Sequence, residues 1–164
     1  MPVACAIASV ARPLGRARAL STQPSKPIRF EDIARAARHI RGAVRQTPCY
    51  KSYPLSQITG AEVFVKQEQS HFTGSFKERG ARYALMQIAK KHAGDPNFKG
   101  VIAASAGNHA LALSWHGPQL NVPITVVMPT LAPIAKVGRC RLLGSNVVVY
   151  GEHILEAYEH SQSE

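Results

Sequence analysis

Four short apolar runs, three of them evenly spaced, constrain the fold of this chain most strongly. They are Glu62–Lys66, Gly100–Ala104, Pro123–Met128 and Asn146–Tyr150. The last three begin 23 residues apart, and each gap is long enough for a helix. Strands that alternate with helices in this way form a parallel sheet covered by helices. We therefore predict an α/β fold with a parallel twisted sheet and helices on both faces.

The segments before and between these runs show helical patterns of apolar residues. The predicted helices are Phe30–Val44, Glu78–His92, Gly107–His116 and Pro133–Leu143. A proline, Pro118, follows the third of them directly after Gly117. Because a proline inside a helix costs ~3 kcal/mol, we expect a break or a kink near Gly117.

The first 27 residues differ from the rest in composition. They contain Arg12, Arg16, Arg18 and Lys26 but neither Asp nor Glu. This composition is typical of an organelle transit peptide, and we predict import into a mitochondrion, with a plastid as the alternative. A secretory signal and a disordered basic tail on a cytoplasmic protein are the other interpretations. Residues 28–164 then form the folded unit.

The formal net charge of +10 does not indicate a nucleic-acid-binding protein. Residues 1–50 hold nine basic and two acidic residues, whereas residues 51–164 hold eleven basic and eight acidic ones. The excess belongs to the leader and the first helix, and the body has no basic patch interleaved with aromatic residues. No apolar run is long enough to span a membrane. The three cysteines lack CxxC spacing, which argues against a disulfide framework or a metal site and suits a reducing compartment.

One lysine lies where a helix is predicted to start. The segment Ser75-Phe76-Lys77-Glu78-Arg79-Gly80 follows a turn and leads into the helix. Lys77 at that position faces the positive end of the helix dipole, which favours the neutral amine that a Schiff base requires. The simpler alternative is a solvated lysine on an amphipathic helix, with Ser75 as its cap and Phe76 in the core.

A second motif, Ser105-Ala106-Gly107-Asn108-His109-Ala110, follows a predicted strand and opens a helix. Backbone N–H groups at such a helix start bind carboxylate or phosphate, and ligands of parallel sheets lie beyond the carboxyl ends of the strands. Gly107 permits close approach to the backbone, and Asn108 offers a donor and an acceptor. The alternative is an ordinary turn capped by Ser105, with His109 as a packing or capping residue.

Taken together, the two motifs resemble those of a known enzyme family. Residues 71–81 are similar to the lysine motif of the threonine/serine dehydratases, and residues 105–110 to their asparagine motif. The resemblance runs from about Phe30 to Tyr158 and includes Arg45-Gln46-Thr47-Pro48. It implies a fold type II pyridoxal-phosphate (PLP) enzyme, of which residues 28–164 would be the N-terminal part, including the small lobe.

The resemblance implies a PLP-dependent L-threonine/L-serine ammonia-lyase, a homo-oligomer without nucleic-acid or membrane partners, with a role such as isoleucine biosynthesis. Lys77 would form the Schiff base with the cofactor and carry protons. Phe76 would lie against the cofactor ring, and Asn108 would hydrogen-bond its phenolic oxygen. The residues that would frame the substrate carboxylate are Ser105, Ala106, Gly107 and His109. No residue is implied as a metal ligand.

Two departures bear on this interpretation. Serine racemases carry a serine, used as a second base, where this chain has Ala106, so racemisation is disfavoured. The glycine-rich loop that cradles the PLP phosphate in this family has no counterpart, since no two glycines are adjacent in residues 1–164. We therefore expect an incomplete enzyme, and the alternative is a non-catalytic fragment that binds a partner subunit.

Overall fold

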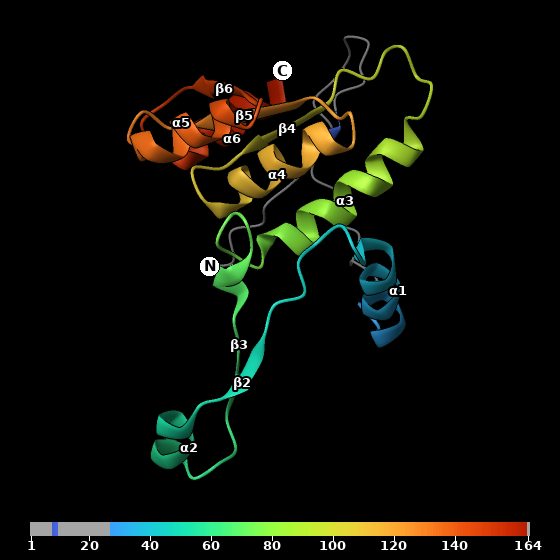
Figure 1. The fold of residues 1–164 in the computed structure, drawn as a ribbon. Coiled ribbons are helices and arrows are strands. Elements are labelled where there is room, and N and C mark those ends of the chain that lie inside the picture. The colour runs from blue at the N-terminus through green and yellow to red at the C-terminus, as the bar shows by residue number, and fades with distance from the viewer. Residues whose placement is uncertain (1–7, 10–26, 164) are drawn as a thin grey trace.

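The computed structural model describes residues 8–9 and 27–163 (Figure 1). Of the predicted leader, only Ala8–Ser9 and residue 27 are among them; the rest of that prediction lies outside the described residues. Ala8–Ser9 forms strand β1, which pairs antiparallel with the edge of the main sheet.

The main sheet confirms the predicted parallel arrangement. Its parallel strands are β4 (Val101–Ala104), β5 (Ile124–Met128) and β6 (Asn146–Val149), in the order β1-β4-β5-β6. Ala103 lies opposite Val126 in the register of β4 and β5. The three parallel strands start and end within one residue of the predicted runs. Their carboxyl ends therefore meet at one edge of the sheet.

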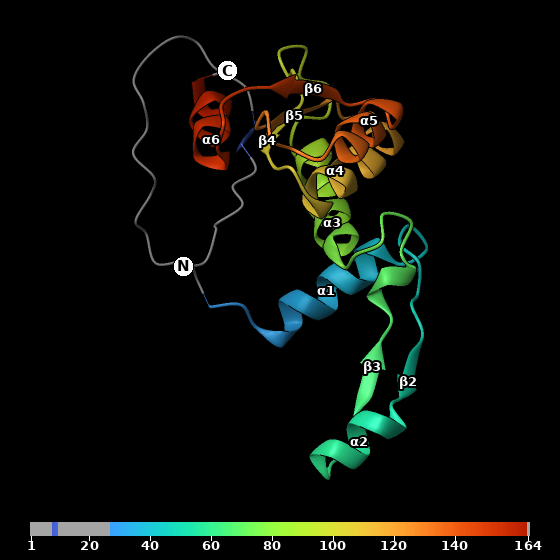
Figure 2. The ribbon, with the colours of Figure 1, turned by 90° about the vertical axis from the view of Figure 1, so that its left-hand side faces the viewer.

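Helices cover both faces of this sheet, as predicted (Figure 2). Helices α4 (Asn108–Gln119) and α5 (Ile134–Leu142) pack on one face, and α6 (Ile154–Ser163) packs on the other. Because side chains alternate along a strand, Ala103 joins the core under α4, whereas Ile102 packs against Ala157 of α6.

Helix α3 (Lys77–Lys91) lies along α4, and α1 (Phe30–Ile40) packs against α3. Leu85 of α3 is fully buried and belongs to the same core as the strands. Helix α1 ends four residues before the predicted boundary at Val44. The reason is local: Arg41 leaves the helical region with ψ of 130°, and Gly42, with φ of +80°, completes a turn closed by the N–H of Ala43 on the carbonyl of Ile40.

A separate arm projects away from the sheet in both views (Figures 1 and 2). Strands β2 (Cys49–Lys51) and β3 (Phe64–Lys66) pair antiparallel, with helix α2 (Tyr53–Thr59) between them and the 3₁₀-helix Glu68–Ser70 after them. The predicted strand at 62–66 thus exists, but outside the main sheet. Helix α2 was not predicted, although Ser52 caps it by accepting a hydrogen bond from the N–H of Leu55.

The break predicted near Gly117 is wrong, whereas the kink predicted there as the alternative stays a prediction. Helix α4 continues through Gly117 and Pro118 to Gln119. Pro118 lacks the N–H that would bond to the carbonyl of Ser114, so α4 gives up one hydrogen bond and ends one residue later. Gly117 serves packing instead, because a Cβ there would lie 2.2 Å from Cγ1 of Ile124 and 2.9 Å from the carbonyl oxygen of Val122.

Candidate active site

The two predicted motifs both lie at helix starts. Lys77 is the first residue of α3, with Phe76 as the N-cap residue, and Asn108 is the first residue of α4, with Gly107 as the N-cap residue. Ser105 Oγ accepts the N–H of Gly107 at 3.3 Å, and Ser75 Oγ accepts the N–H of Lys77 at 3.3 Å. Helices α3 and α4 pack side by side.

Lys77 and Phe76 form an exposed pair at the start of α3. The Nζ atom of Lys77 lies 4.9 Å from the centre of the Phe76 ring. Phe76 is 57% exposed, so its interpretation as a core residue is wrong. An aromatic face and an amine are thus presented together to the space outside the helix start.

His109 connects the second motif to Lys77. Burial lowers the pKa of His109, and the positive charge of Lys77 lowers it further. The imidazole is therefore neutral at neutral pH. Within the described residues, its Nε2 atom is buried without a hydrogen-bond partner. The lysine and asparagine motifs, about thirty residues apart in sequence, hence lie within electrostatic reach of each other.

The turn before α4 has features that suit a ligand. Lys136 of α5 donates a hydrogen bond to Oδ1 of Asn108 at 2.6 Å, which turns the amide NH₂ group the other way. A Cβ placed on Gly107 would meet no other protein atom within 4 Å. Open space therefore lies beside Gly107 at this helix start, the kind of position at which anions bind.

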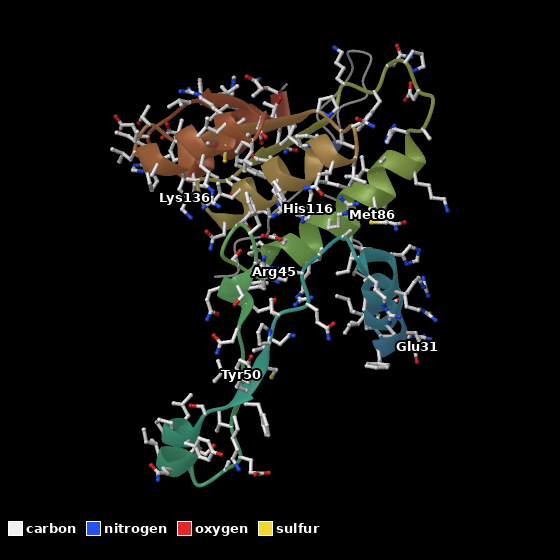
Figure 3. All side chains as sticks on the ribbon, viewed as in Figure 1. Glu31, Arg45, Tyr50, Met86, His116 and Lys136 are labelled. Carbon is white, nitrogen blue, oxygen red and sulfur yellow. The ribbon has the colours of Figure 1, made fainter. Side chains whose placement is uncertain are left out.

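A buried carboxylate holds the loop before Lys77. Glu78 is 2% exposed and accepts a hydrogen bond from the backbone N–H of Thr73. Its Oε2 atom lies 3.6 Å from Nδ1 of His71 and 3.9 Å from Nε2 of His116, a residue of α4 (Figure 3). Burial lowers the pKa of His116 to about 4, so this imidazole is neutral.

A second carboxylate extends this network toward the arm. Arg79 donates two hydrogen bonds of 2.8 Å to Glu68, whose Oε1 also accepts the hydroxyl of Thr47 at 2.6 Å. The hydrogen bond from Arg79 holds the pKa of Glu68 well below its usual range, and Glu68 raises the pKa of Arg79. Nε2 of His71 lies 3.1 Å from Glu68, so His71 lies between two carboxylates.

Two arginines hold the same loop by its carbonyl groups. Arg139 of α5 donates to the carbonyl of Phe72 at 2.8 Å, and Arg45 donates to that of Ser70 at 2.9 Å. The Phe72 ring stacks on Trp115 of α4 with the ring centres 3.8 Å apart. Contacts from α3, α4, α5 and the segment after α1 therefore fix the position at which Lys77 begins its helix.

Sequence reasoning missed these supporting residues. The sequence shows Glu78 only as part of the lysine motif. It does not reveal the burial of this side chain, because that burial depends on how α3 packs against α4. Lys136 had a detectable signal, since a lysine early in the helix after the adjacent parallel strand lies near the same sheet edge as Asn108.

The described residues 8–9 and 27–163 lack two further features. No group of three or more His, Cys, Asp or Glu side chains there is placed to hold a metal ion. No helix in that part of the chain is both long and apolar enough to cross a membrane.

Comparison with family models matches residues 40–164 to the pyridoxal-phosphate dependent enzymes. The chain belongs to this family. The match includes both motifs, so the cofactor implied by the sequence resemblance is the one that characterises the family. The exposed amine of Lys77, the aromatic face of Phe76 and the NH₂ donor of Asn108 are groups that fit its aldehyde, ring and phenolic oxygen.

Relatives with assigned activities match the same region. The chain is 39% identical over 132 residues to the L-threonine ammonia-lyase of Thermotoga maritima. This match covers 80% of the chain and 32% of the relative. It is 42% identical over 123 residues to an L-threo-3-hydroxyaspartate ammonia-lyase of Pseudomonas, covering 74% of the chain and 37% of the relative. The chain thus spans about a third of the length of these relatives.

Solved structures of the same family share this fold. The processed form of threonine deaminase isoform 2 from Solanum lycopersicum superposes with a TM-score of 0.67 at 31% identity, over 82% of this chain and 38% of that one. Serine racemase from Dictyostelium discoideum gives a TM-score of 0.71 at 32% identity, over 81% of this chain and 42% of that one. Fold likeness alone therefore does not separate lyases from racemases.

Proposed function

We propose that the chain is the N-terminal part of the catalytic unit of a PLP-dependent ammonia-lyase that acts on L-threonine and L-serine. Threonine would give 2-oxobutanoate and ammonia, and serine would give pyruvate and ammonia. The observation that supports this best is that the segment carrying both motifs matches the pyridoxal-phosphate dependent enzymes and is 39% identical to an L-threonine ammonia-lyase.

PLP, when bound, supplies an electron sink for loss of the α-proton and the β-hydroxyl of the amino acid. In the proposed enzyme Lys77 holds the cofactor through Nζ and moves a proton at that atom. Phe76 lies along the cofactor ring, and the NH₂ group of Asn108 donates to its phenolic oxygen.

The turn before α4 would bind the substrate. The turn lies at the start of α4, where a carboxylate is stabilised by the helix dipole, and open space lies beside Gly107. The N–H groups of Ser105 and Gly107 already donate to the carbonyl of Val127 and to Oγ of Ser105. The neutral imidazole of His109 can accept or donate a hydrogen bond there without adding a charge. Ala106 has no proton to give or take, which favours a lyase over a racemase at this position.

The test is to measure 2-oxobutanoate formation from L-threonine with saturating PLP. Two proteins are compared: residues 28–164, and the same residues joined to the second half of a threonine ammonia-lyase relative. We expect turnover only from the joined protein. Correct positioning of reactants contributes ~7–11 kcal/mol in favourable cases, so losing half of it slows the reaction by about a thousandfold.

Two variants of the joined protein are also compared: Lys77→Ala, which removes the proposed cofactor-binding amine, and Lys91→Ala, its matched control. Lys91 is an exposed lysine in the last turn of the same helix. Activity lost with the first and kept with the second supports the proposal. Equal turnover from the short and joined proteins would contradict the reading of an incomplete enzyme. No turnover from the joined protein would contradict the proposed reaction.

A non-catalytic fragment that binds a partner subunit is the second candidate. The observation that favours it is that the chain spans only about a third of its relatives' length. The two candidates separate on incubation of the 164-residue chain with PLP. A Schiff-base absorbance that disappears in Lys77→Ala supports a cofactor-binding unit, whereas no such absorbance supports the fragment.

We further propose that the complete enzyme is a homo-oligomer in amino-acid metabolism such as isoleucine biosynthesis. We also propose that residues 1–27 direct import into a mitochondrion, with a plastid as the alternative. The acid-free, arginine-bearing composition of that segment supports import. A fluorescent reporter fused to residues 1–30 should enter the organelle, while one fused to residues 28–58 should stay diffuse in the cytosol. A diffuse signal from both would contradict import.

A further inference from the structure

A contact between α5 and the start of α4 decides how Asn108 can act. The Nζ atom of Lys136 lies 2.6 Å from Oδ1 of Asn108, across 28 residues of sequence. Lys136 is half-buried and belongs to the first turn of α5, where its backbone N–H bonds to the carbonyl of Pro133. The lysine therefore reaches Asn108 from a fixed helical position.

The chemistry of the two groups allows only one orientation of the amide. A lysine ammonium has three N–H donors and no acceptor, whereas an asparagine amide has one oxygen acceptor and one NH₂ donor group. Only the oxygen can face Lys136. The NH₂ group of Asn108 must then point away from Lys136, and it is the group that the amide presents on that other side.

We propose that Lys136 is a positioning residue, which fixes the Asn108 amide so that its NH₂ group donates to the phenolic oxygen of the cofactor. This inference rests on the proposed function. A flipped amide would place its carbonyl oxygen against a negatively charged oxygen and repel it. The ammonium also polarises the amide, which strengthens the hydrogen bond that the NH₂ group donates.

A direct contact of Lys136 with the cofactor is the competing explanation. The two differ in their dependence on Asn108. If Lys136 acts through the amide, removing the amide also removes any effect of Lys136. If it binds the cofactor directly, its effect persists without Asn108. A double-mutant cycle separates these cases.

The experiment uses the full-length holoenzyme with Lys136→Met, Lys136→Arg, Asn108→Ala and the double variant Lys136→Met/Asn108→Ala. Lys99→Met is the matched control, because Lys99 is exposed and precedes β4 at the opposite edge of the sheet. Two quantities are measured: the dissociation constant for PLP, and the ratio of the absorption bands that report whether the phenolic oxygen of bound PLP carries a proton.

Lys136→Met should weaken PLP binding about tenfold, the size expected for one hydrogen bond to a charged group. It should also raise the fraction of cofactor with a protonated phenolic oxygen, because a donated hydrogen bond favours the unprotonated form. Lys136→Arg, which keeps the donors, should stay near wild type, as should Lys99→Met. Adding Lys136→Met to Asn108→Ala should change neither quantity.

If the wild-type protein takes up PLP and Lys136→Met has the same PLP dissociation constant and the same ratio of absorption bands, the inference is overturned. The proposed function then remains intact. Additive effects in the double variant would overturn the inference in favour of direct contact. Wild-type protein that takes up no PLP in a Lys77-dependent manner would overturn the proposed function and the inference together.

Discussion

The carboxylate of Glu78 turns back from the first turn of α3 to accept the backbone N–H of Thr73, five residues earlier. The contact is buried, and it closes the loop that ends at Lys77. Glu78 therefore fixes the backbone position of the neighbouring Lys77. The side chain of Glu78 is buried in the interior, whereas that of Lys77 is exposed.

Replacing Glu78 by alanine should lower the free energy of unfolding by about 3 kcal/mol. The change leaves the buried N–H of Thr73 without the carboxylate that accepts it, and an unsatisfied buried donor costs about 1–3 kcal/mol, more where the lost partner is charged. Urea unfolding followed by the fluorescence of Trp115, the single tryptophan of the chain, measures it. Glu62→Ala is the control, since its ion pair with Lys51 is exposed and such pairs contribute at most about 1 kcal/mol. Equal losses in the two variants would contradict the role of Glu78.

Stability should fall as the pH drops from 6.5 toward 4, and His116 should account for much of the fall. Burial lowers its pKa to about 4 from 6.5, so between these values the unfolded chain binds a proton that the folded chain does not. Stability then rises with pH across that window, by about 3 kcal/mol in total. Glu78 and Arg82 are the charged groups that act on this imidazole in opposite directions.

The measurement is the free energy of unfolding at several pH values between 4 and 7, for wild type and His116→Gln. The variant should show a shallower dependence, with a remainder from His109, whose pKa is also lowered by burial. An unchanged slope in His116→Gln would show that the imidazole is not the titrating group.

Alanine should have opposite effects at two helical glycines. At Gly117 a methyl group would collide with Ile124 and with the backbone of Val122, and overpacking of this kind costs about 1–3 kcal/mol. At Gly138, in α5, a methyl group would meet no atom within 4 Å, and alanine should stabilise the helix by about 0.5–1 kcal/mol. Thermal unfolding of both variants checks this, and a stable Gly117→Ala protein would contradict the close packing of α4 on β5.

Asn108→Ala and Ser105→Ala should separate cofactor binding from substrate binding in the complete enzyme. Loss of the Asn108 amide should weaken PLP binding and change its absorption spectrum, whereas loss of the Ser105 hydroxyl should mainly raise the KM for threonine. Spectra and steady-state kinetics of the two variants provide the test. An unchanged spectrum together with full activity in Asn108→Ala would remove Asn108 from the site.

Much of the fold follows from local patterns in the sequence. Strands β4 and β5 are largely buried, β6 is partly buried, and all three are apolar runs flanked by Gly, Pro or Ser, which marks them clearly. The arm was harder to predict: the side chains of Cys49, Tyr50 and Lys51 in β2 are all exposed, so no alternation of buried and exposed residues reveals that strand.

In the candidate site, too, some residues follow from the local sequence, whereas others depend on how the helices pack. Lys77 and Asn108 lie at helix starts that the sequence indicates through a turn and a strand end. The contacts that support them depend on packing between helices: Glu78 meets His116 only because α3 lies along α4, and Lys136 meets Asn108 only because α5 follows the adjacent strand. Such contacts are properties of the assembled sheet, and only that of Lys136 is indicated by the order of strands and helices in the sequence.

The most direct test of the account is to locate the lysine that holds PLP. The full-length protein is incubated with PLP, reduced with borohydride and digested, and the peptides are analysed by mass spectrometry. The account predicts a phosphopyridoxyl group on Lys77, lost in Lys77→Ala and retained in Lys91→Ala. A modification found on another lysine, or at equal yield in Lys77→Ala, would contradict the assignment of Lys77 as the cofactor-binding residue.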